Sequence, residues 1–600
     1  MISDHINQEL LTLKEKKNYR SLPPLIHDGR NVILNGQRMV NLSSNDYLGL
    51  ANNISLRKEF LKTITPETFL PTSSSSRLLT GNFTDYQELE QQLAAMFGTE
   101  SALIFNSGYH ANTGILPAVS NAQTLILADK LVHASLIDGI RLSSAKCIRY
   151  RHNDLSQLQR LISENHNAYE QIIIVTESIF SMDGDEADLH ALVQLKKSYS
   201  NILLYVDEAH AFGVRGDNGL GCAEEQNCIN DIDFLVGTFG KAIASAGAYI
   251  ACRQVIREYL INKMRTFIFT TALPPINIQW TSWILEQLPS LQEKRTHLLR
   301  ISNKLKTALV DKGYNCPSVS HIVPMIVGAS ENTICKAEEI QRKGFYALPV
   351  RPPTVPEGTS RIRFSLTADI TEHEIDQLIK LMKQHFIIKN NQKHLLLFFA
   401  GWGMDETPFL QIRPTNKDWL ICYDYRSLEF DAIILQEYSE ITLIAWSMGV
   451  WAASQIMKQY PSLPLSQSIA INGTPYPIHE TKGITPAIFE GTLQGLNEQS
   501  LQKFQRRMCG STAGYKTFQT VAPQRSIEEL KEELAAIQKQ YLSLPPSDFA
   551  WQKAIIGKND HIFLPDSQWL AWRNKVDSLE YTEAAHYQQE LFDNVIMRIN

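Results

Sequence analysis

The sequence predicts an α/β fold built from two successive, mostly parallel sheets. Short apolar runs that are typical of buried strands, such as residues 202–206, alternate with helical patterns over much of the 600-residue chain. Residues able to do chemistry follow several of these runs, at positions where parallel strands would end at one edge of a sheet. The alternation restarts after a short polar stretch at residues 387–393, which predicts a second domain.

The composition excludes several classes of function. The chain carries 57 basic and 63 acidic residues, a net charge of −6, without a long block of like charge, which argues against nucleic acid or a membrane surface as a partner. Eight scattered cysteines without a C-x-x-C pair indicate neither a metal site nor a disulfide framework. The N-terminus lacks an apolar signal core, and the run at 395–400 is too short to span a bilayer. We therefore expect a soluble cytoplasmic protein without a metal.

The expected elements fall into two ranges. The first domain is expected at residues 1–388, with a large part at about 45–285 and a small part at about 290–388. Its expected strands lie at residues 102–105, 124–128, 172–175, 202–206 and 234–236. The second domain is expected at 392–600, with strands at 395–399, 419–423, 441–445 and 553–557. Residues 475–547, between the expected strands at 441–445 and 553–557, are predicted to form a lid-like insertion. It includes an amphipathic helix, in which Leu530, Leu534 and Ile537 recur at helical spacing.

Lys241 is the first candidate catalytic residue. It follows the strand at 234–236 and lies in a loop that Gly237 and Gly240 allow to turn tightly. A lysine becomes a useful nucleophile when it condenses with an aldehyde, and pyridoxal phosphate (PLP) supplies both the aldehyde and an electron sink. Thr238 is placed to hold a phosphate oxygen. On its own, such a lysine is more often a solvated surface residue.

The segment after residues 202–206 favours the PLP hypothesis. Asp207 ends this strand and could pair with a pyridinium nitrogen, and His210 could reach the ring hydroxyl. In isolation the pair would be better explained as an N-capping Asp and a surface His. Gly108 follows the strand at 102–105, permits close approach of the backbone, and precedes a helix whose N–H groups could bind a phosphate.

Residues 1–388 resemble the α-oxoamine synthases, PLP enzymes of the aspartate-aminotransferase fold (fold type I). The resemblance rests on Asp207 to His210, Thr238 to Lys241, and further motifs in family order: Asn-Asp-Tyr-Leu-Gly at 45–49, Ser-Gly-Tyr-His-Ala-Asn at 107–112, Phe-Ser-Met-Asp-Gly at 180–184 and Arg-Pro-Pro-Thr-Val-Pro at 351–356. It implies that Tyr109 joins Gly108 at the phosphate, that His133 lies over the cofactor ring, and that Ser181 contacts the cofactor. It also implies a homodimer, to which residues 269–275 contribute by crossing to the partner subunit.

Three residues are candidates for binding the substrates of this half. The resemblance implies that Arg20 reaches the acyl substrate, although a solvated charge at a helix end explains it equally well. Thr354 lies in the 351–356 motif. Arg361 is our candidate for the amino-acid carboxylate, because a guanidinium binds a carboxylate through two hydrogen bonds, and its alternative is a charge at a strand edge.

Ser447 is the candidate nucleophile of the second domain. Ala-Trp-Ser-Met-Gly at 445–449 follows the strand at 441–445 and resembles a nucleophile elbow, with Ala445 in place of the usual first glycine. A helix-capping serine would be the simpler explanation of these five residues alone. Asp560 and then His586 follow along the chain, in the order Ser, acid, His of α/β-hydrolases. Asp424 also follows an expected strand and is the alternative acid.

Residues 392–600 resemble the BioG-type pimeloyl-[acyl-carrier protein] methyl ester esterases. The resemblance rests on Phe-Phe-Ala-Gly-Trp-Gly-Met at 398–404, Cys-Tyr-Asp-Tyr-Arg at 422–426 and Trp-Ser-Met-Gly at 446–449. By analogy with α/β-hydrolases, the backbone N–H groups of Trp402 and Met448 would form an oxyanion hole. Lys503, Arg506 and Arg507 are either a solvated helix face or a patch for an acidic acyl-carrier protein.

The two resemblances together imply a bifunctional enzyme of biotin synthesis. The second half would hydrolyse the methyl ester of a pimeloyl thioester, and the first would condense that thioester with L-alanine to give 8-amino-7-oxononanoate. Motifs leave open whether the thioester is on carrier protein or coenzyme A. Two alternatives remain: a 2-amino-3-oxobutyrate ligase joined to an unrelated hydrolase, and a second half that only docks a carrier protein.

Overall fold

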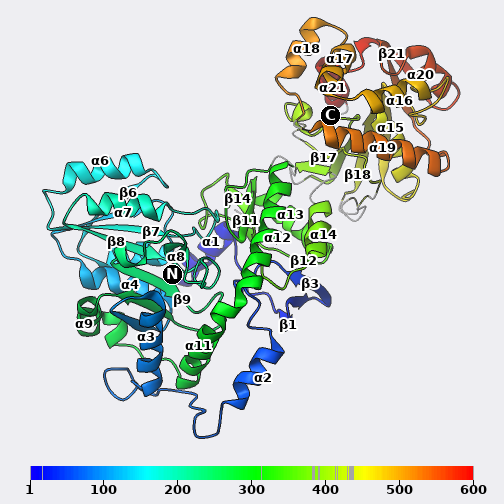
Figure 1. Cartoon of the computed structure of the whole chain (residues 1–600). Coiled ribbons are helices and arrows are strands. Elements are labelled where there is room, and N and C mark those ends of the chain that lie inside the picture. Colours follow the sequence, from blue (N-terminus) through cyan, green and yellow to red (C-terminus); the bar gives the residue numbers. More distant parts are fainter. Residues whose placement is uncertain are drawn as a thin grey trace. The chain divides into compact units, whose positions relative to one another are not determined.

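The computed structural model divides the chain into two compact units (Figure 1). It describes residues 2–15, 18–311, 314–381, 385–388, 392–412, 414, 416–428, 430, 435, 438–523 and 525–598. The first unit comprises Met1–Val310 and Tyr314–Ile379, and the second comprises Lys380–Asn600 with Asp311–Gly313.

The division lies earlier in the chain than we predicted. Strand β15 (His385–Ile388) pairs antiparallel with β17 (Asp418–Cys422) and so belongs to the sheet of the second unit. The predicted boundary at residues 388–392 is therefore too late. An isolated four-residue strand carries no periodicity that would assign it to one sheet or the other.

A seven-stranded sheet forms the centre of the first unit, in the order β4-β10-β9-β8-β7-β5-β6. Its strands are β4 (Ser101–Phe105), β5 (Thr124–Asp129), β6 (Lys146–Tyr150), β7 (Gln171–Glu177), β8 (Ile202–Asp207), β9 (Phe234–Thr238) and β10 (Ala248–Cys252). All neighbours are parallel except β10, which is antiparallel to both β4 and β9. Every residue of β4, β5 and β10 is buried, as expected for a sheet covered on both faces.

The smaller part of the first unit has two further sheets. One has the order β11-β14-β13 and is formed by β11 (Ile322–Gly328), β14 (Ser360–Ser365) and β13 (Pro349–Val350). The other has the order β1-β2-β3-β12 and joins β1 (Ile26–Asp28), β2 (Asn31–Leu34) and β3 (Gln37–Asn41) to the distant β12 (Phe345–Tyr346). The N-terminal residues thus belong to the small sheet region, which the sequence did not indicate.

Several helices of the first unit lie before β6 in the chain and alternate with its strands or precede them. They include α1 (Ile2–Glu15), α3 (Thr84–Phe97), α4 (Gly108–Val119) and α5 (Ala134–Leu142). Leu89, Leu93 and Phe97 recur at helical spacing and are all buried on α3.

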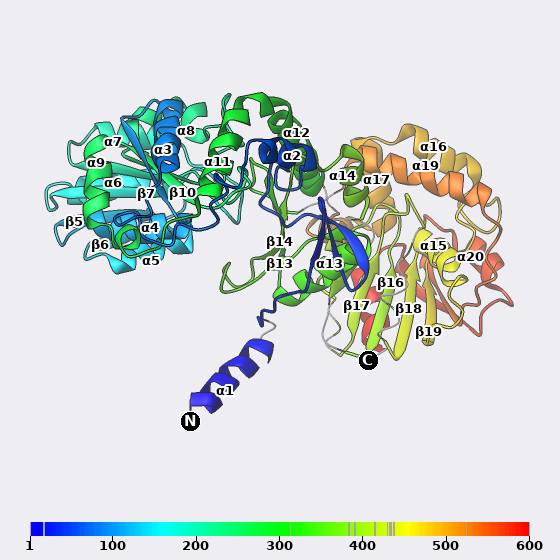
Figure 2. The ribbon, with the colours of Figure 1, turned by 90° about the horizontal axis from the view of Figure 1, so that it is seen from below.

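The second unit also has a seven-stranded sheet, in the order β15-β17-β16-β18-β19-β20-β21. Its remaining strands are β16 (His394–Phe399), β18 (Glu440–Trp446), β19 (Leu465–Ile471), β20 (Lys553–Asn559) and β21 (Ser578–Ala585), all parallel to their neighbours and to β17. Figure 2 shows β17, β16, β18 and β19 side by side. Helix α15 (Met448–Met457) follows β18 directly.

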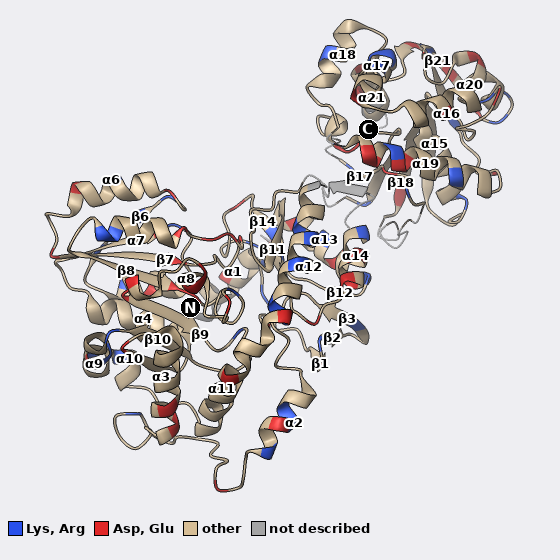
Figure 3. Ribbon diagram, in the orientation of Figure 1, with Lys and Arg blue, Asp and Glu red and all other residues tan. Residues whose placement is uncertain are grey.

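Four helices lie between β19 and β20, within the range predicted for the insertion. They are α16 (Pro486–Gly495), α17 (Glu498–Cys509), α18 (Thr512–Gln519) and α19 (Ile527–Ser543). On α19, Leu530, Leu534 and Ile537 are buried. Basic residues occupy the last turn of α17 (Figure 3). Among the described residues, no helix combines the length and apolarity needed to cross a bilayer.

Candidate active sites

Lys241 lies in the loop that follows β9 and contacts His210, three residues after the end of β8. Its Nζ is 2.8 Å from Nε2 of His210, and Nδ1 of His210 is 2.7 Å from the hydroxyl of Tyr47. Burial lowers the pKa of Lys241 to about 8, against the opposing effect of the Asp207 and Glu177 carboxylates. Burial and the charge of Lys241 lower the pKa of His210 well below its ordinary value, so the imidazole is neutral. The amine is therefore easily deprotonated near neutral pH.

Asp207, at the end of β8, is held by a side-chain network that also reaches His133. Asn112 on α4 donates to Asp207 Oδ2 at 2.7 Å and to the hydroxyl oxygen of Ser135 at 2.9 Å. That hydroxyl is 2.7 Å from Nδ1 of His133, which caps α5. Tyr205 donates to the Asn112 carbonyl oxygen at 2.7 Å. The predicted ring acid and the predicted stacking histidine thus share one hydrogen-bond network, in which Asn112 and Ser135 have roles that the sequence did not reveal.

The predicted phosphate-binding residues meet where β9 ends and α4 begins. A Cβ added at Gly108 would lie 3.8 Å from the Cβ of Thr238, so the Thr238 side chain lies beside the start of α4. The Thr238 hydroxyl accepts from the N–H of Gly240 at 3.2 Å and donates to a carbonyl at 3.0 Å. Tyr109 is 53% exposed and donates from its hydroxyl to Asp138 at 2.8 Å. The N–H groups at the start of α4 are suitable donors for a phosphate, and the Thr238 hydroxyl becomes one when it rotates away from the carbonyl.

Arg361, our candidate for the carboxylate, is already engaged. It is 4% exposed, forms an ion pair with Asp183 and donates to the carbonyl of Thr359 at 3.1 Å. Arg363, two residues further along β14, donates to the carbonyl of Ser181 at 2.5 Å, and its charge helps to lower the pKa of Lys241. Arg361 is thus paired with a carboxylate, whereas the contacts of Arg363 are to neutral oxygens, those of Ser181, Asn45 and Ser365. The two arginines lie on the same face of β14, so periodicity could not distinguish them. The ion-pair partner of Arg361, Asp183, lies in the 180–184 motif, far away in the sequence.

The other two substrate candidates of this half lie together. Arg20 donates from Nη2 to the hydroxyl of Thr354 at 2.9 Å, although 334 residues separate them in the sequence. The contact gives Arg20 a partner in the first unit, in contrast to the isolated solvated charge that the sequence also allowed.

Ser447 lies at the turn between β18 and α15, as predicted. Its φ of 59° is in the left-handed region, a strained conformation for serine that is typical of a nucleophile elbow. Its N–H donates to the carbonyl of Ile471 at 3.0 Å, which fixes the turn to β19. A Cβ added at Gly449 would lie 2.4 Å from the carbonyl oxygen of Ala400, so the tight packing of α15 requires glycine there.

Ser447, His586 and Asp560 form a hydrogen-bonded chain. Nε2 of His586 is 3.0 Å from Oγ of Ser447, and Nδ1 is 2.9 Å from Oδ2 of Asp560. The serine is 5% exposed and the other two are 1% exposed. Asp560 also accepts from the N–H groups of Ile562 at 2.8 Å and Phe563 at 3.0 Å, which keeps its carboxylate in place. This is the geometry of a serine hydrolase triad.

Asp424, the alternative acid, lies in a different environment. It binds Arg426 through two contacts of 2.8 and 2.7 Å and lies 3.4 Å from Arg525. The carboxylate of Asp424 is thus occupied by arginines, and it is Asp560 that contacts His586.

An apolar pocket opens over the triad. Ser447 and His586 contribute to it, and the rest of its lining includes Trp402, Met448, Phe489, Phe504, Leu534 and Arg507. Trp402 and Met448, the predicted oxyanion residues, therefore both face the space beside the nucleophile.

Comparisons with known proteins identify the two units. The model for aminotransferase class I and II matches residues 37–381. The chain belongs to the class I and II aminotransferase family. The model for pimeloyl-ACP methyl esterase BioG matches residues 382–595. The two family resemblances of the sequence are thus confirmed. The two matched ranges meet at residues 381 and 382, close to the boundary between the units of the structure.

Relatives of the aminotransferase-family unit share more than half of their residues with it. A protein of Pasteurella multocida is 55% identical over 381 residues, which cover 63% of this chain and 98% of the relative. One of Glaesserella parasuis is 59% identical over 377 residues, which cover 62% and 99%. Both are named, provisionally, as 8-amino-7-oxononanoate synthases.

Solved structures with the same fold include PLP enzymes. Serine palmitoyltransferase from S. paucimobilis, which carries PLP bound with myriocin, is 27% identical with a TM-score of 0.58 and covers 63% of this chain and 96% of its own. The 8-amino-7-oxononanoate synthase of Francisella tularensis is 28% identical with a TM-score of 0.50, over 57% and 96%. Fold type I is therefore confirmed for the aminotransferase-family unit, and its cofactor is pyridoxal phosphate. The residues present fit this group, since an acid, a lysine and phosphate donors converge on one sheet edge.

Proposed function

We propose that this chain catalyses two consecutive reactions of biotin synthesis. The second unit hydrolyses the methyl ester of pimeloyl-acyl-carrier protein, and the first condenses a pimeloyl thioester with L-alanine to give 8-amino-7-oxononanoate and carbon dioxide. One observation carries the proposal: a complete Ser447–His586–Asp560 triad in a BioG-matching unit shares a chain with a lysine site related to these synthases. The product of the ester hydrolysis is then the acyl donor of the condensation.

In the esterase reaction, Ser447 attacks the ester carbonyl while His586 takes its proton. Asp560, bound to Nδ1 of His586, holds the imidazole in the tautomer that accepts at Nε2. The backbone N–H groups of Trp402 and Met448 stabilise the negative charge on the carbonyl oxygen. Methanol leaves with the proton from His586, and a water activated by the same histidine releases the free carboxylic acid.

In the synthase reaction, the residues of the first unit bind, orient and move protons. Pyridoxal phosphate, when bound, supplies a carbonyl that reacts with amines and an electron sink for negative charge at the amino-acid α-carbon. Lys241 would hold the cofactor and remove the alanine α-proton, and its lowered pKa of about 8 suits a base near neutral pH. Asp207 and His210 would bind the cofactor ring, His133 would cover it, and the Gly108 and Thr238 region, with Tyr109 and Ser181 nearby, would bind the phosphate end.

The substrates would be held by the arginines. We assign Arg363, in place of Arg361, to the alanine carboxylate, because its guanidinium lies close enough to Lys241 to lower the lysine pKa. The Arg20–Thr354 pair would bind the acyl thioester.

A homodimer through the first unit is part of the proposal. Phe269, in the segment expected to cross to the partner, is 72% exposed, and Leu79 is 78% exposed, so apolar surface is available for a second copy. The eight cysteines are free, as in proteins of a reducing compartment such as the cytoplasm.

The deciding experiment supplies the purified protein with pimeloyl-carrier methyl ester, L-alanine and PLP, and identifies the products by mass. We expect methanol, the demethylated thioester and 8-amino-7-oxononanoate. Preference for glycine with an acetyl thioester would replace the synthase assignment by a ligase. Failure of Ser447 to react with a fluorophosphonate would leave the second unit as a docking module only.

A further inference from the structure

The segment that carries Trp402 passes directly beside the esterase nucleophile. A Cβ added at Gly401 would lie 3.0 Å from the Cβ of Ser447, and Gly403 has a φ of +78°, which favours glycine. Residues 401–404 follow β16 as a turn without regular structure. An oxyanion donor must be fixed before the reaction to be effective, so something outside this turn has to hold it.

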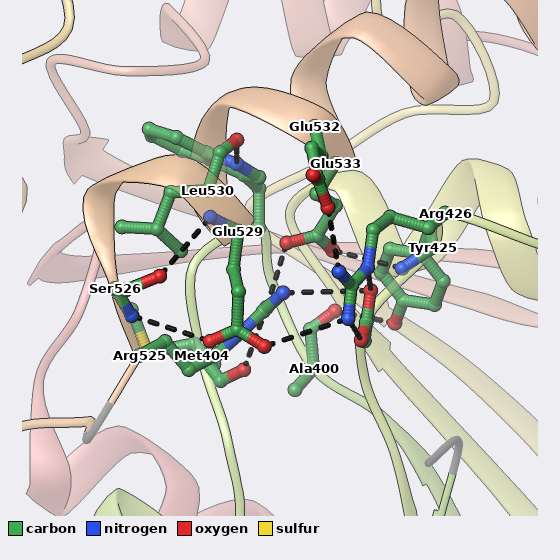
Figure 4. Close-up of polar contacts among 12 residues, drawn as sticks. Ala400, Met404, Tyr425, Arg426, Arg525, Ser526, Glu529, Leu530, Glu532 and Glu533 are labelled. Atoms are coloured by element: carbon green, nitrogen blue, oxygen red, sulfur yellow. Dashed lines mark hydrogen bonds and ion pairs between the residues drawn. The ribbon is translucent and has the colours of Figure 1, made fainter. Parts of the chain in front are cut away.

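Three side chains hold the segment through hydrogen bonds, and Figure 4 draws the residues around Tyr425, Arg525 and Leu530 that take part. The hydroxyl of Tyr425 donates to the carbonyl of Ala400 at 2.6 Å. The indole N–H of Trp402 donates to the carbonyl of Leu530 on α19 at 3.1 Å. Nη1 of Arg525 donates to the carbonyl of Met404 at 3.2 Å. The turn is thus bound at its start, middle and end.

A buried ion cluster joins these three contacts. The side chain of Arg525 is 4% exposed, and it contacts Glu533 on α19 at 2.7 Å and Asp424 at 3.4 Å. Glu533, which is fully buried, also accepts from the backbone N–H of Tyr425 at 2.9 Å. Arg525 therefore connects α19 to the 401–404 turn through charged hydrogen bonds to Glu533 and Met404, which are the strong kind in a buried setting. Through Glu533 it is also linked to the backbone of Tyr425, and it forms an ion pair with Asp424.

We propose that Arg525 is a positioning residue of the esterase: paired with Glu533, it fixes the 401–404 turn so that the Trp402 N–H faces the carbonyl oxygen of the ester. This inference rests on the proposed esterase function. It also gives Asp424 a role, as the second carboxylate that contacts Arg525. Helix α19, which carries Glu533, would then help to position the oxyanion donor in addition to lining the pocket.

Arg426 provides a matched control in the same cluster. It binds Asp424 at 2.7 Å and Glu532 at 2.8 Å on the more exposed side, with its side chain 29% exposed. Within the described residues, none of the contacts of Arg426 is with the 401–404 turn.

The test compares the full-length Arg525→Met and Arg426→Met proteins, assayed on the pimeloyl-carrier methyl ester and on p-nitrophenyl butyrate. For Arg525→Met we expect kcat to fall at least tenfold on both esters while KM changes less than threefold, because substrate binding in the apolar pocket is retained. For Arg426→Met we expect kcat within threefold of wild type. Arg525→Lys, which can still reach Glu533, should recover part of the loss.

Trp402→Phe keeps the proposal testable if Arg525→Met does not fold. This variant retains the backbone N–H and removes only the indole donor to Leu530, and kcat should again fall with KM little changed. If Arg525→Met and Arg426→Met lower the unfolding temperature equally and both retain kcat, the cluster is only structural and the proposal fails. If Trp402→Phe retains the kcat of the wild type, the proposal also fails. A wild type active on p-nitrophenyl butyrate but not on the pimeloyl ester would refute the proposed function alone.

Discussion

The two active sites differ in what holds their functional side chains. In the second unit, Ser447, His586 and Asp560 are bonded to one another at 3.0 and 2.9 Å. In the first, Asp207 is held by Asn112 and Lys241 contacts His210, so each functional group has its own supporting neighbour. The triad contains the nucleophile, base and acid that its reaction needs, whereas the lysine site needs bound pyridoxal phosphate. This difference predicts that the sites fail in different ways when they are altered.

The largest effects should come from the two nucleophiles. Ser447→Ala should lower methyl-ester hydrolysis by roughly 10⁶-fold, as for the loss of a triad serine, and leave condensation of the free-acid thioester with alanine unchanged. Lys241→Ala should do the reverse and should also lose the visible absorption of the bound cofactor while it still folds. Product analysis by mass and an absorption spectrum measure both. Loss of condensation in Ser447→Ala would refute two independent sites, and an unchanged spectrum in Lys241→Ala would place the cofactor elsewhere.

The triad acid should rank next. Asp560→Asn should lower esterase kcat by about 10⁴-fold, because the asparagine amide would favour the wrong tautomer of His586. The matched variant Asp424→Asn should lose less than tenfold, since Asp424 contacts Arg426 and Arg525 and not the histidine. Steady-state hydrolysis of the methyl ester decides between them. The reverse ranking would mean that our choice of acid is wrong while the serine mechanism stands.

The sequence predicted the sites best where function depends on residues near strand ends. Lys241, Ser447 and Asp560 follow predicted strands, which the structure has as β9, β18 and β20, and Asp207 ends β8. The sequence did not predict β21, which precedes His586. It could not predict β10 or β12, since an antiparallel strand inserted into a parallel sheet and a partner 300 residues away leave no local signal. Residues 389–391, within the expected linker, lie outside the described residues.

The choice between the two arginines of β14 shows the same limit at one residue. Arg361 and Arg363 have equal chemistry and lie on one strand face, so only tertiary contacts separate them. The Asp183 partner of Arg361 comes from the loop after β7, nearly 180 residues away in the sequence. A buried ion pair and a substrate ligand cannot be distinguished before that loop is placed.

These arginines supply the third prediction. Arg363→Ala should raise the KM for alanine about 100-fold with the cofactor content unchanged, because a bidentate carboxylate contact is lost. Arg361→Ala should instead lower the free energy of unfolding by about 3–5 kcal/mol, since it leaves the Asp183 carboxylate without its buried partner, and should change the KM for alanine little. Titration with alanine and denaturant unfolding measure the two effects. An Arg361→Ala protein of normal stability that no longer binds alanine would restore our original assignment.

The smallest effect concerns pH and tests why the lysine site is poised to accept its cofactor. Burial lowers the pKa of Lys241 from 10.5 to about 8 in the protein without cofactor. Because the amine reacts only when it is unprotonated, the rate of PLP uptake by the apoprotein should rise about fivefold from pH 7 to 8 and level off above pH 9. An exposed lysine would be only about 0.3% neutral at pH 8 and its rate would still be rising at pH 10. Stopped-flow absorbance measures the uptake, with N-acetyl-lysine as the solvent-exposed control. A midpoint near 10 would show that the loop opens before the lysine reacts, and the burial that we infer for Lys241 would then not act on its chemistry.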